Sequence, residues 1–217
     1  MSNRISSDDG LPKSLDGIRV IDFTWVRAGP WANRWLGSLG AQIIKIEWPP
    51  NADLLRGNVG STPQDIEPTL NTSGQFNDTN ANKFSLSVNL RSQKGLDTVK
   101  KLISMSDVVI ENFSSRVMEN IGLGYDQLKE LQPNIIYVSM AGFGHTGRHH
   151  SYTTFGSSAQ ALSGQSFISG LPGEVPAGWG WSYLDDTGGM YGAMTVLTAL
   201  HHKNMTGEGQ YVDLSQM

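Results

Sequence analysis

Short apolar runs alternate with segments of helical periodicity along the chain, and no other feature constrains its fold as strongly. Residues 18–23 (IRVIDF) have the length and apolar content of a buried strand. A helical pattern begins near Pro30 and ends at Gly40, and residues 42–47 (QIIKIE) are the next predicted strand. A strand, a helix and a strand in this order predict two parallel strands joined by a right-handed crossover.

The same alternation continues towards the C-terminus. Shorter helical patterns lie at 93–105 and 125–131, and a long one carries Met190, Met194 and Leu200 at helical spacing. Alternation of this kind predicts an open α/β sheet. The remaining predicted strands are 84–88, 107–110, 135–138 and 210–214.

Two long segments, 49–82 and 142–180, have little periodicity and are rich in Gly, Pro, Ser and Thr. Loops of this length are uncommon in compact domains and are usually functional. A short apolar helical patch at 159–162 interrupts the second segment. The chain stops at Met217, soon after a Gly-rich turn and with no closing tail, so we expect a longer protein to continue from this point.

Composition and charge exclude several classes of protein. The 217 residues include 16 Lys and Arg against 20 Asp and Glu, a net charge of −4, and no cysteine. A mild acidic excess without a basic cluster argues against nucleic acid or an anionic membrane as the main partner. The lack of cysteine excludes disulfides, thiol catalysis and thiolate zinc sites. With no apolar stretch of about 18–20 residues and no apolar N-terminal region, a cytoplasmic protein is expected.

Two adjacent carboxylates, Asp185 and Asp186, occur where a Gly-rich stretch meets the start of the long helix. The positive end of the helix dipole favours an ionised carboxylate there, and such a group can act as a nucleophile. Position alone favours a plain helix N-cap over a functional role, and the residues do not choose between the two aspartates. Gly188 and Gly189 favour a functional role, because glycines in a first turn lower helix stability and let a ligand approach the backbone.

The histidines do not have the spacing of a metal site. His145, His149 and His150 lie with Arg148 in a segment that has no acidic residue, and their spacing does not match ligands on one helix face, so a solvated loop is predicted. His201 and its neighbour lie near the C-terminal end of the long helix, where a positive charge interacts favourably with the negative end of the helix dipole. No metal is predicted.

The turn after the first strand is a candidate ligand site of a different kind. Residues 26–30 (VRAGP) replace the G-x-G-x-x-G fingerprint there, so a nicotinamide dinucleotide site is not expected. Arg27 can hold a phosphate or carboxylate at this position, or it can be solvated. Trp179, Trp181 and Tyr183 either wall a pocket or pack in the interior.

Four segments, taken in order, resemble the family III CoA-transferases, the superfamily that includes formyl-CoA transferase, carnitine CoA-transferase and alpha-methylacyl-CoA racemase. The segments begin LDGIRVIDFTWVRAGP, NANKFSLSVNLRSQKG, SDVVIENFSSRV and LDDTGGMYGAMTVL, and the likeness runs from about Leu15 to Met217. It implies a Rossmann-like open parallel sheet with helices on both faces, the N-terminal part of the large domain of an interlocked-dimer fold. The polar composition of residues 1–14 predicts a leader. The resemblance implies this domain at 15–205 and a linker beginning at 206–217 towards a small domain absent from the chain.

The resemblance also implies the site residues. The family's nucleophile is an Asp followed four residues later by Gly, which makes Asp185, with Gly189, the catalytic residue. The chain departs from the pattern at Trp48 and Asn120, where some members carry basic residues. CoA contacts are implied at Arg27, Ala28, Val88, Asn89, Leu90, Arg91, Asn112, Phe113 and Ser114, of which Arg91 is a natural phosphate partner.

The implied reaction uses a carboxylate and no metal or redox cofactor. Asp185 attacks the acyl-CoA carbonyl to form an anhydride, the released CoA thiolate converts this to an aspartyl-CoA thioester, and an incoming carboxylic acid takes over the CoA. The expected substrates are therefore coenzyme A as an acyl-CoA thioester and a small carboxylic acid. The expected protein partner is a second copy, as an interlocked homodimer, or a second subunit that completes the fold.

Two alternatives stay open. The racemase branch pairs the same Asp with a histidine in a Gly-His-Asp segment, and residues 154–160 (TFGSSAQ) hold no histidine in that place, although His149 and His150 are close in sequence. The other alternative is a truncated, non-catalytic subunit that binds CoA and is inactive as this fragment. The acyl donor and acceptor are not predicted.

Overall fold

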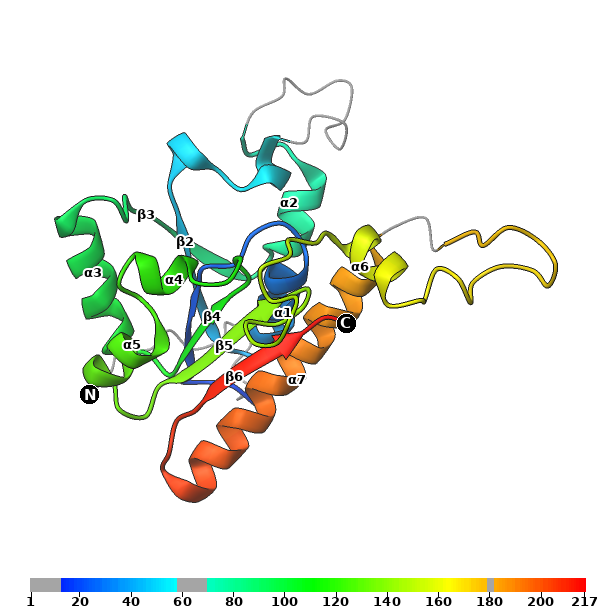
Figure 1. Cartoon of the computed structure of the whole chain (residues 1–217). Coiled ribbons are helices and arrows are strands. Elements are labelled where there is room, and N and C mark those ends of the chain that lie inside the picture. The colour runs from blue at the N-terminus through cyan, green and yellow to red at the C-terminus, as the bar shows by residue number, and fades with distance from the viewer. Residues whose placement is uncertain (1–12, 58–69, 179–181) are drawn as a thin grey trace.

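The structure, a computed structural model, describes residues 13–57, 70–178 and 182–217 and contains one six-stranded parallel sheet with the strand order β3-β2-β1-β4-β5-β6 (Figure 1). The chain reverses its direction of travel across the sheet between β1 and β4, as in Rossmann folds. The predicted α/β class and all six predicted strands are confirmed. The strands are β1 (Arg19–Asp22), β2 (Gln42–Glu47), β3 (Lys83–Ser87), β4 (Val108–Glu111), β5 (Ile136–Ala141) and β6 (Tyr211–Ser215).

Helices cover both faces of the sheet, as the Rossmann-like prediction requires. One face packs against α1 and α7, and the other packs against α3, α4 and α5. Two 3-10 turns, η1 (Pro49–Asn51) and η2 (Leu54–Gly57), follow β2. The helices are α1 (Ala28–Ser38), α2 (Gly74–Thr79), α3 (Gln93–Ile103), α4 (Val117–Asn120), α5 (Tyr125–Leu131), α6 (Gly156–Leu162) and α7 (Tyr183–Thr206).

The central strands form because their side chains are buried on both sides of the sheet. In β1, Val20 packs towards α1 and α7, whereas Ile21 packs towards α3 and α5. In β4, Val108 and Val109 divide between the two faces in the same way. Each such side chain contributes about 1.5–3 kcal/mol to the stability of the folded state, which explains the continuous apolar runs of these strands.

The start of α7 differs from the predicted one. Ser182 is the N-cap residue, so Asp185 and Asp186 lie inside the first turn, and the prediction that one of them caps the helix is wrong. The apolar spacing that predicts this helix marks its buried face only in part, because Leu200 is buried whereas Met190 and Met194 are 52% and 58% exposed.

Small residues form most of the buried face of α7. Gly189 lies against α1, where an added Cβ would be 2.6 Å from the carbonyl oxygen of Ala28. Gly192 lies against Ala32 and Met140. Gly188 and Gly189, predicted in the first turn, lie in the second turn, and at Gly189 the neighbouring helix occupies the space that was predicted to admit a ligand.

The long segments contain more regular structure than predicted. Residues 49–51 and 54–57 form η1 and η2, residues 74–79 form α2, and the patch predicted at 159–162 is the end of α6. Residues 1–12 of the expected leader, and Trp179 and Trp181, lie outside the described residues. The strand β6 pairs with β5 at the edge of the sheet, within the segment expected to begin a linker.

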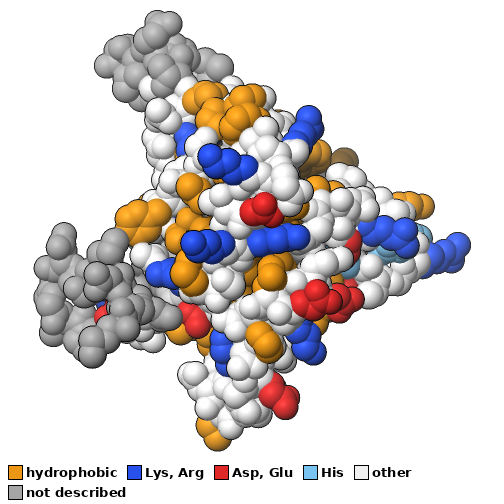
Figure 2. All heavy atoms as spheres, turned by 90° about the vertical axis from the view of Figure 1, so that its left-hand side faces the viewer, with side chains coloured by type: hydrophobic (Ala, Val, Ile, Leu, Met, Phe, Trp, Pro, Cys, Tyr) orange, Lys and Arg blue, Asp and Glu red, His pale blue; other side chains and the backbone are white. Residues whose placement is uncertain are grey.

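The surface over α3, α4 and α5 carries both signs of charge. Figure 2 shows acidic and basic side chains interspersed on this face, with isolated apolar groups between them.

None of the helices in the described parts of the chain is long and apolar enough to cross a membrane.

Replacing Gly189 by Ala tests the close packing of α7 on α1. Alanine is the better helix former by about 1 kcal/mol, but its Cβ would overlap a backbone oxygen of α1, so we expect a net loss of about 1–3 kcal/mol in the free energy of unfolding. Urea denaturation measures this loss. Gly57→Ala is the matched control, because an added Cβ there meets nothing within 4 Å; equal stabilities of the two variants would contradict the packing assignment.

Candidate active site

A cavity of about 190 Å³ opens where β1, β4 and β5 end, and the first turn of α7 closes it. This is the edge where open α/β sheets bind ligands. The side chains come from segments far apart in the sequence, and Asp185 is the carboxylate among the described residues that line the cavity. The lining residues are 25–28 after β1, 112–114 after β4, 140–142 at the end of β5, 153–155, Asp185 and Gln216.

The structure brings most of the predicted site residues together in this cavity. Asp185 lines it together with Arg27 and Ala28 from the turn after β1. The segment after β4 contributes Asn112, Phe113 and Ser114.

The segment that follows β3 lies elsewhere. Val88 and Leu90 pack against the core under α3, and Asn89 accepts a hydrogen bond from the Arg91 backbone N–H (2.9 Å). Arg91 is exposed. None of these four residues lines the Asp185 cavity, so their assignment as CoA contacts stays a prediction.

Asp185 is 9% exposed, and burial raises the pKa of its carboxyl. Hydrogen bonds from the Ser182 side chain and the Gly156 backbone oppose this rise, as does the charge of Arg27, whereas Asp186 adds to it. The expectation that the helix N-terminus favours the charged form therefore omits the larger effect, which is desolvation. Gly156 lies so close that an added Cβ would be 2.7 Å from the Asp185 Cγ, which leaves room for a hydrogen only.

Asp186 has a different role from Asp185. Its Oδ1 lies 2.7 Å from the Arg27 Nε, and it is not among the residues that line the cavity. Arg27 also lies 5.1 Å from the centre of the Trp31 ring and 4.0 Å from Asp78. Asp186 therefore holds Arg27 at the cavity wall, and Asp185 is the carboxylate of the two that faces the cavity.

A buried hydrogen-bonded cluster behind the cavity was not predicted. Glu111, at the end of β4, accepts a hydrogen bond from the Phe113 backbone N–H (2.7 Å) and another from the Ser139 hydroxyl. The His145 Nε2 lies 3.0 Å from the Ser139 oxygen and 3.6 Å from Glu111. Burial raises the pKa of Glu111 to about 7. A glutamate that ends an apolar strand was the available signal, because a buried carboxyl needs partners.

The predicted solvated histidine loop is correct only in part. His149 and Arg148 are exposed, but the His145 side chain is 9% exposed and belongs to the Glu111 cluster. Among residues 13–57, 70–178 and 182–217, no three His, Asp or Glu side chains converge as metal ligands.

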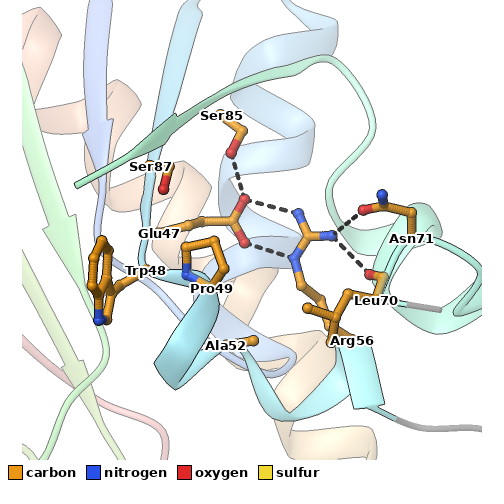
Figure 3. Close-up of a pocket in the computed structure, with 9 residues that line it drawn as sticks. All are labelled: Glu47, Trp48, Pro49, Ala52, Arg56, Leu70, Asn71, Ser85 and Ser87. Carbon is orange, nitrogen blue, oxygen red and sulfur yellow. Dashed lines mark hydrogen bonds and ion pairs between the residues drawn. The ribbon is translucent and has the colours of Figure 1, made fainter. Parts of the chain in front are cut away.

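A second pocket of about 280 Å³ lies at the ends of β2 and β3 (Figure 3). Arg56 donates to both carboxylate oxygens of Glu47 (2.8 Å each), and its third nitrogen donates to the Leu70 carbonyl and the Asn71 side chain. Trp48 lies at the rim, where the resemblance leads one to expect a basic residue. The guanidinium in this pocket thus serves to join β2 to the segment at 70–71.

Comparisons with known proteins show the family of the chain. Residues 15–217 match CoA-transferase family III. The chain is 37% identical over 215 residues to the succinyl-CoA–L-malate CoA-transferase alpha subunit of Chloroflexus aurantiacus, covering 99% of this chain and 49% of that protein. It is 34% identical over 203 residues to the formyl-CoA:oxalate CoA-transferase of Streptomyces coelicolor, covering 94% and 48%.

A solved structure has the same fold. A CaiB/BaiF family protein from Brucella suis superimposes with a TM-score of 0.88 and 32% identity, covering 95% of this chain and 54% of that one. The chain thus spans about half the length of the relatives that it matches.

The raised pKa of Asp185 predicts that Asp185→Asn stabilises the protein at neutral pH. The folded state binds this proton more tightly than the unfolded state, so ionising the carboxyl lowers stability as pH rises above its ordinary value of 3.8. We expect the variant to melt higher at pH 7, by roughly 2–4 °C for each kcal/mol gained, with the gain vanishing near pH 3.5. Thermal unfolding across this pH range measures the effect. Asp186→Asn, which removes the ion pair with Arg27, is the control and should show no gain at pH 7.

The Glu111 cluster predicts a second pH effect. Because the pKa of Glu111 rises from 4.5 to about 7 on folding, stability should fall as pH rises through this interval, by about 3 kcal/mol in total. Glu111→Gln should remove that decline. Urea denaturation at pH 4.5, 6 and 7.5 compares the two proteins, and equal slopes against pH would contradict the assignment.

Proposed function

The chain belongs to CoA-transferase family III, and from this premise we propose that it transfers CoA from an acyl-CoA thioester to a carboxylic acid, with Asp185 as the nucleophile. The observation that carries the proposal is the position of Asp185: a desolvated carboxylate that faces a cavity at the ligand-binding edge of the sheet. Relatives at 34–38% identity named as CoA-transferases support the same reaction class.

The proposed chemistry needs one carboxylate and the thioester. An Asp185 oxygen attacks the acyl carbonyl carbon, the C–S bond breaks, and CoA leaves as a thiolate while an acyl anhydride forms. The thiolate then attacks the Asp185 carbonyl, releases the first acid as a carboxylate and leaves an aspartyl-CoA thioester. A second carboxylate attacks the carbonyl carbon of this thioester, which releases the CoA thiolate and forms a second anhydride. The thiolate then attacks the acyl carbon of the second acid, which forms the new acyl-CoA and frees the Asp185 carboxylate.

Two properties of the Asp185 carboxyl favour this role. A raised pKa makes a carboxylate more basic and hence a stronger nucleophile once it is ionised. Its hydrogen bonds to Ser182 and Gly156 fix the direction of the oxygens, and fixed orientation is the main way in which such a site accelerates a reaction between two bound groups.

The proposed enzyme works with further polypeptide, either as a homodimer or with a second subunit. Exposed apolar side chains support this: Met190 and Tyr191 on α7, and Phe167 and Ile168 on the segment that projects between α6 and α7 (Figure 1). Two relatives are named as alpha and beta subunits of one CoA-transferase. An interlocked arrangement, a small domain after residue 217 and a cytoplasmic location belong to the same proposal.

A covalent-trapping experiment tests the function. The protein is incubated with a panel of acyl-CoA esters, with and without hydroxylamine, and its intact mass is measured. We expect an adduct that hydroxylamine converts to a hydroxamate on Asp185, because anhydrides and thioesters are both activated carboxyls. The productive ester would give the donor class.

Two variants serve as controls for this experiment. Asp185→Asn should abolish the adduct while leaving CoA binding largely intact. Asp186→Asn should still form the adduct, although more slowly, because it loses the ion pair that holds Arg27. Turnover by Asp185→Asn would exclude Asp185 as the nucleophile. CoA binding without any adduct in the unmodified protein would favour the non-catalytic CoA-binding subunit.

A further inference from the structure

The turn after β1 contains a residue in an unfavourable backbone conformation. Val26 has a φ of 63°, in the left-handed region that β-branched residues rarely adopt. Such a conformation persists only where the surrounding structure holds it. The turn lines the Asp185 cavity, so what holds Val26 also determines the shape of the cavity wall.

A buried carboxylate holds this residue. Both oxygens of Asp53 lie within hydrogen-bond distance of the Val26 backbone N–H, at 3.2 and 3.1 Å, and Oδ1 also accepts from the Leu55 N–H (3.0 Å). The Asp53 side chain is 1% exposed. Hydrogen bonds to an ionised acceptor in a buried setting are stronger than those between neutral groups.

Side chains from two other segments bond the neighbouring peptide groups. The Lys45 Nζ donates to the Thr24 carbonyl (2.6 Å) and lies 3.5 Å from Asp53. Asn112 accepts from the Trp25 N–H (2.8 Å) and donates to the Trp25 carbonyl (2.9 Å). The backbone of residues 24–26 is thus tied to β2, to the segment after η1 and to the end of β4.

We propose that Asp53 is a positioning residue for the CoA transfer assigned above. It does not line the cavity, whereas Val26, Arg27 and Ala28 do. By fixing Val26 in its left-handed conformation, Asp53 sets where Arg27 and Ala28 stand relative to Asp185. This role rests on the proposed function, but the geometry that it requires can be tested without turnover.

Hydrogen–deuterium exchange, followed by mass spectrometry of the peptide at 23–29, tests that geometry. Asp53→Asn keeps the size of the side chain and removes its charge, and Asp53→Glu keeps the charge but displaces it, so the second variant remains informative if the first fails to fold. In both variants we expect exchange at 23–29 to rise about tenfold or more, with β4 and α7 unchanged. Unchanged exchange at 23–29, or an equal rise along the whole chain, would overturn the proposal.

Asp107→Asn is the matched control for these variants. Asp107 also accepts a backbone N–H, that of Arg19 (2.9 Å), and lies 3.7 Å from the Lys203 Nζ, but at the opposite end of the sheet. This variant should leave exchange at 23–29 unchanged. A rise there equal to that of Asp53→Asn would mean that Asp53 acts only through global stability.

Kinetics distinguish positioning from support of the fold. Asp53→Asn should lower kcat about tenfold or more with a smaller change in KM. Adding Val26→Gly should restore part of the loss, because glycine adopts a positive φ without strain, whereas adding Val26→Ala should not. Absence of rescue by Val26→Gly would overturn the role assigned to Asp53. If the unmodified protein has no transferase activity, the proposed function fails, and the exchange measurement still decides the role of Asp53.

Discussion

Four charged side chains are buried close together at the end of β1, and the wall of the cavity that Asp185 faces depends on their pairing. The Lys83 Nζ lies 3.0 Å from Asp22 and the Lys45 Nζ 3.5 Å from Asp53, and all four side chains are 2% exposed or less. Burial lowers the pKa of Lys83 to about 8, and the charge of Asp22 opposes this change. A buried charge without its partner destabilises a fold by several kcal/mol. The pair of Lys83 and Asp22 therefore holds β3 against β1, and the pair of Lys45 and Asp53 holds the segment after η1 against β2. The turn after β1 is therefore fixed before any ligand arrives.

The close contact of α7 with α1 supplies the other half of the site. Ala28 packs its carbonyl group against Gly189 and also lines the cavity that Asp185 faces. The backbone that packs the two helices is thus also a wall of this cavity. The separation between Asp185 and the turn after β1 is set by core packing, and a reaction between two positioned groups needs such a rigid frame.

The sequence predicts the strands well, because parallel strands buried on both faces are continuous apolar runs. It does not predict α4, whose 4 residues are too short to have a helical period, or the inner face of α7, where glycines replace large apolar residues. In the site, the resemblance to a known family selects Asp185. The long-range hydrogen bonds of Asp53 and Glu111 cannot be predicted from the sequence, since the partners Val26 and Ser139 lie 27 and 28 residues away and depend on how the strands align. A charge within an apolar run shows that a partner exists without showing which residue it is.

Two features that lower the stability of the fold lie on the same cavity. One is the buried Asp185 carboxyl, whose raised pKa means that ionising it opposes folding, and the other is the left-handed conformation of Val26. Hydrogen bonds from their neighbours support both features. The Val26 backbone N–H donates to Asp53, and the Asp185 carboxyl accepts from Ser182 and Gly156. Stability alone would favour an amide at position 185 and a glycine at position 26. That both unfavourable choices occur at one cavity, each supported by its neighbours, is the pattern expected where residues serve a reaction and not only the fold.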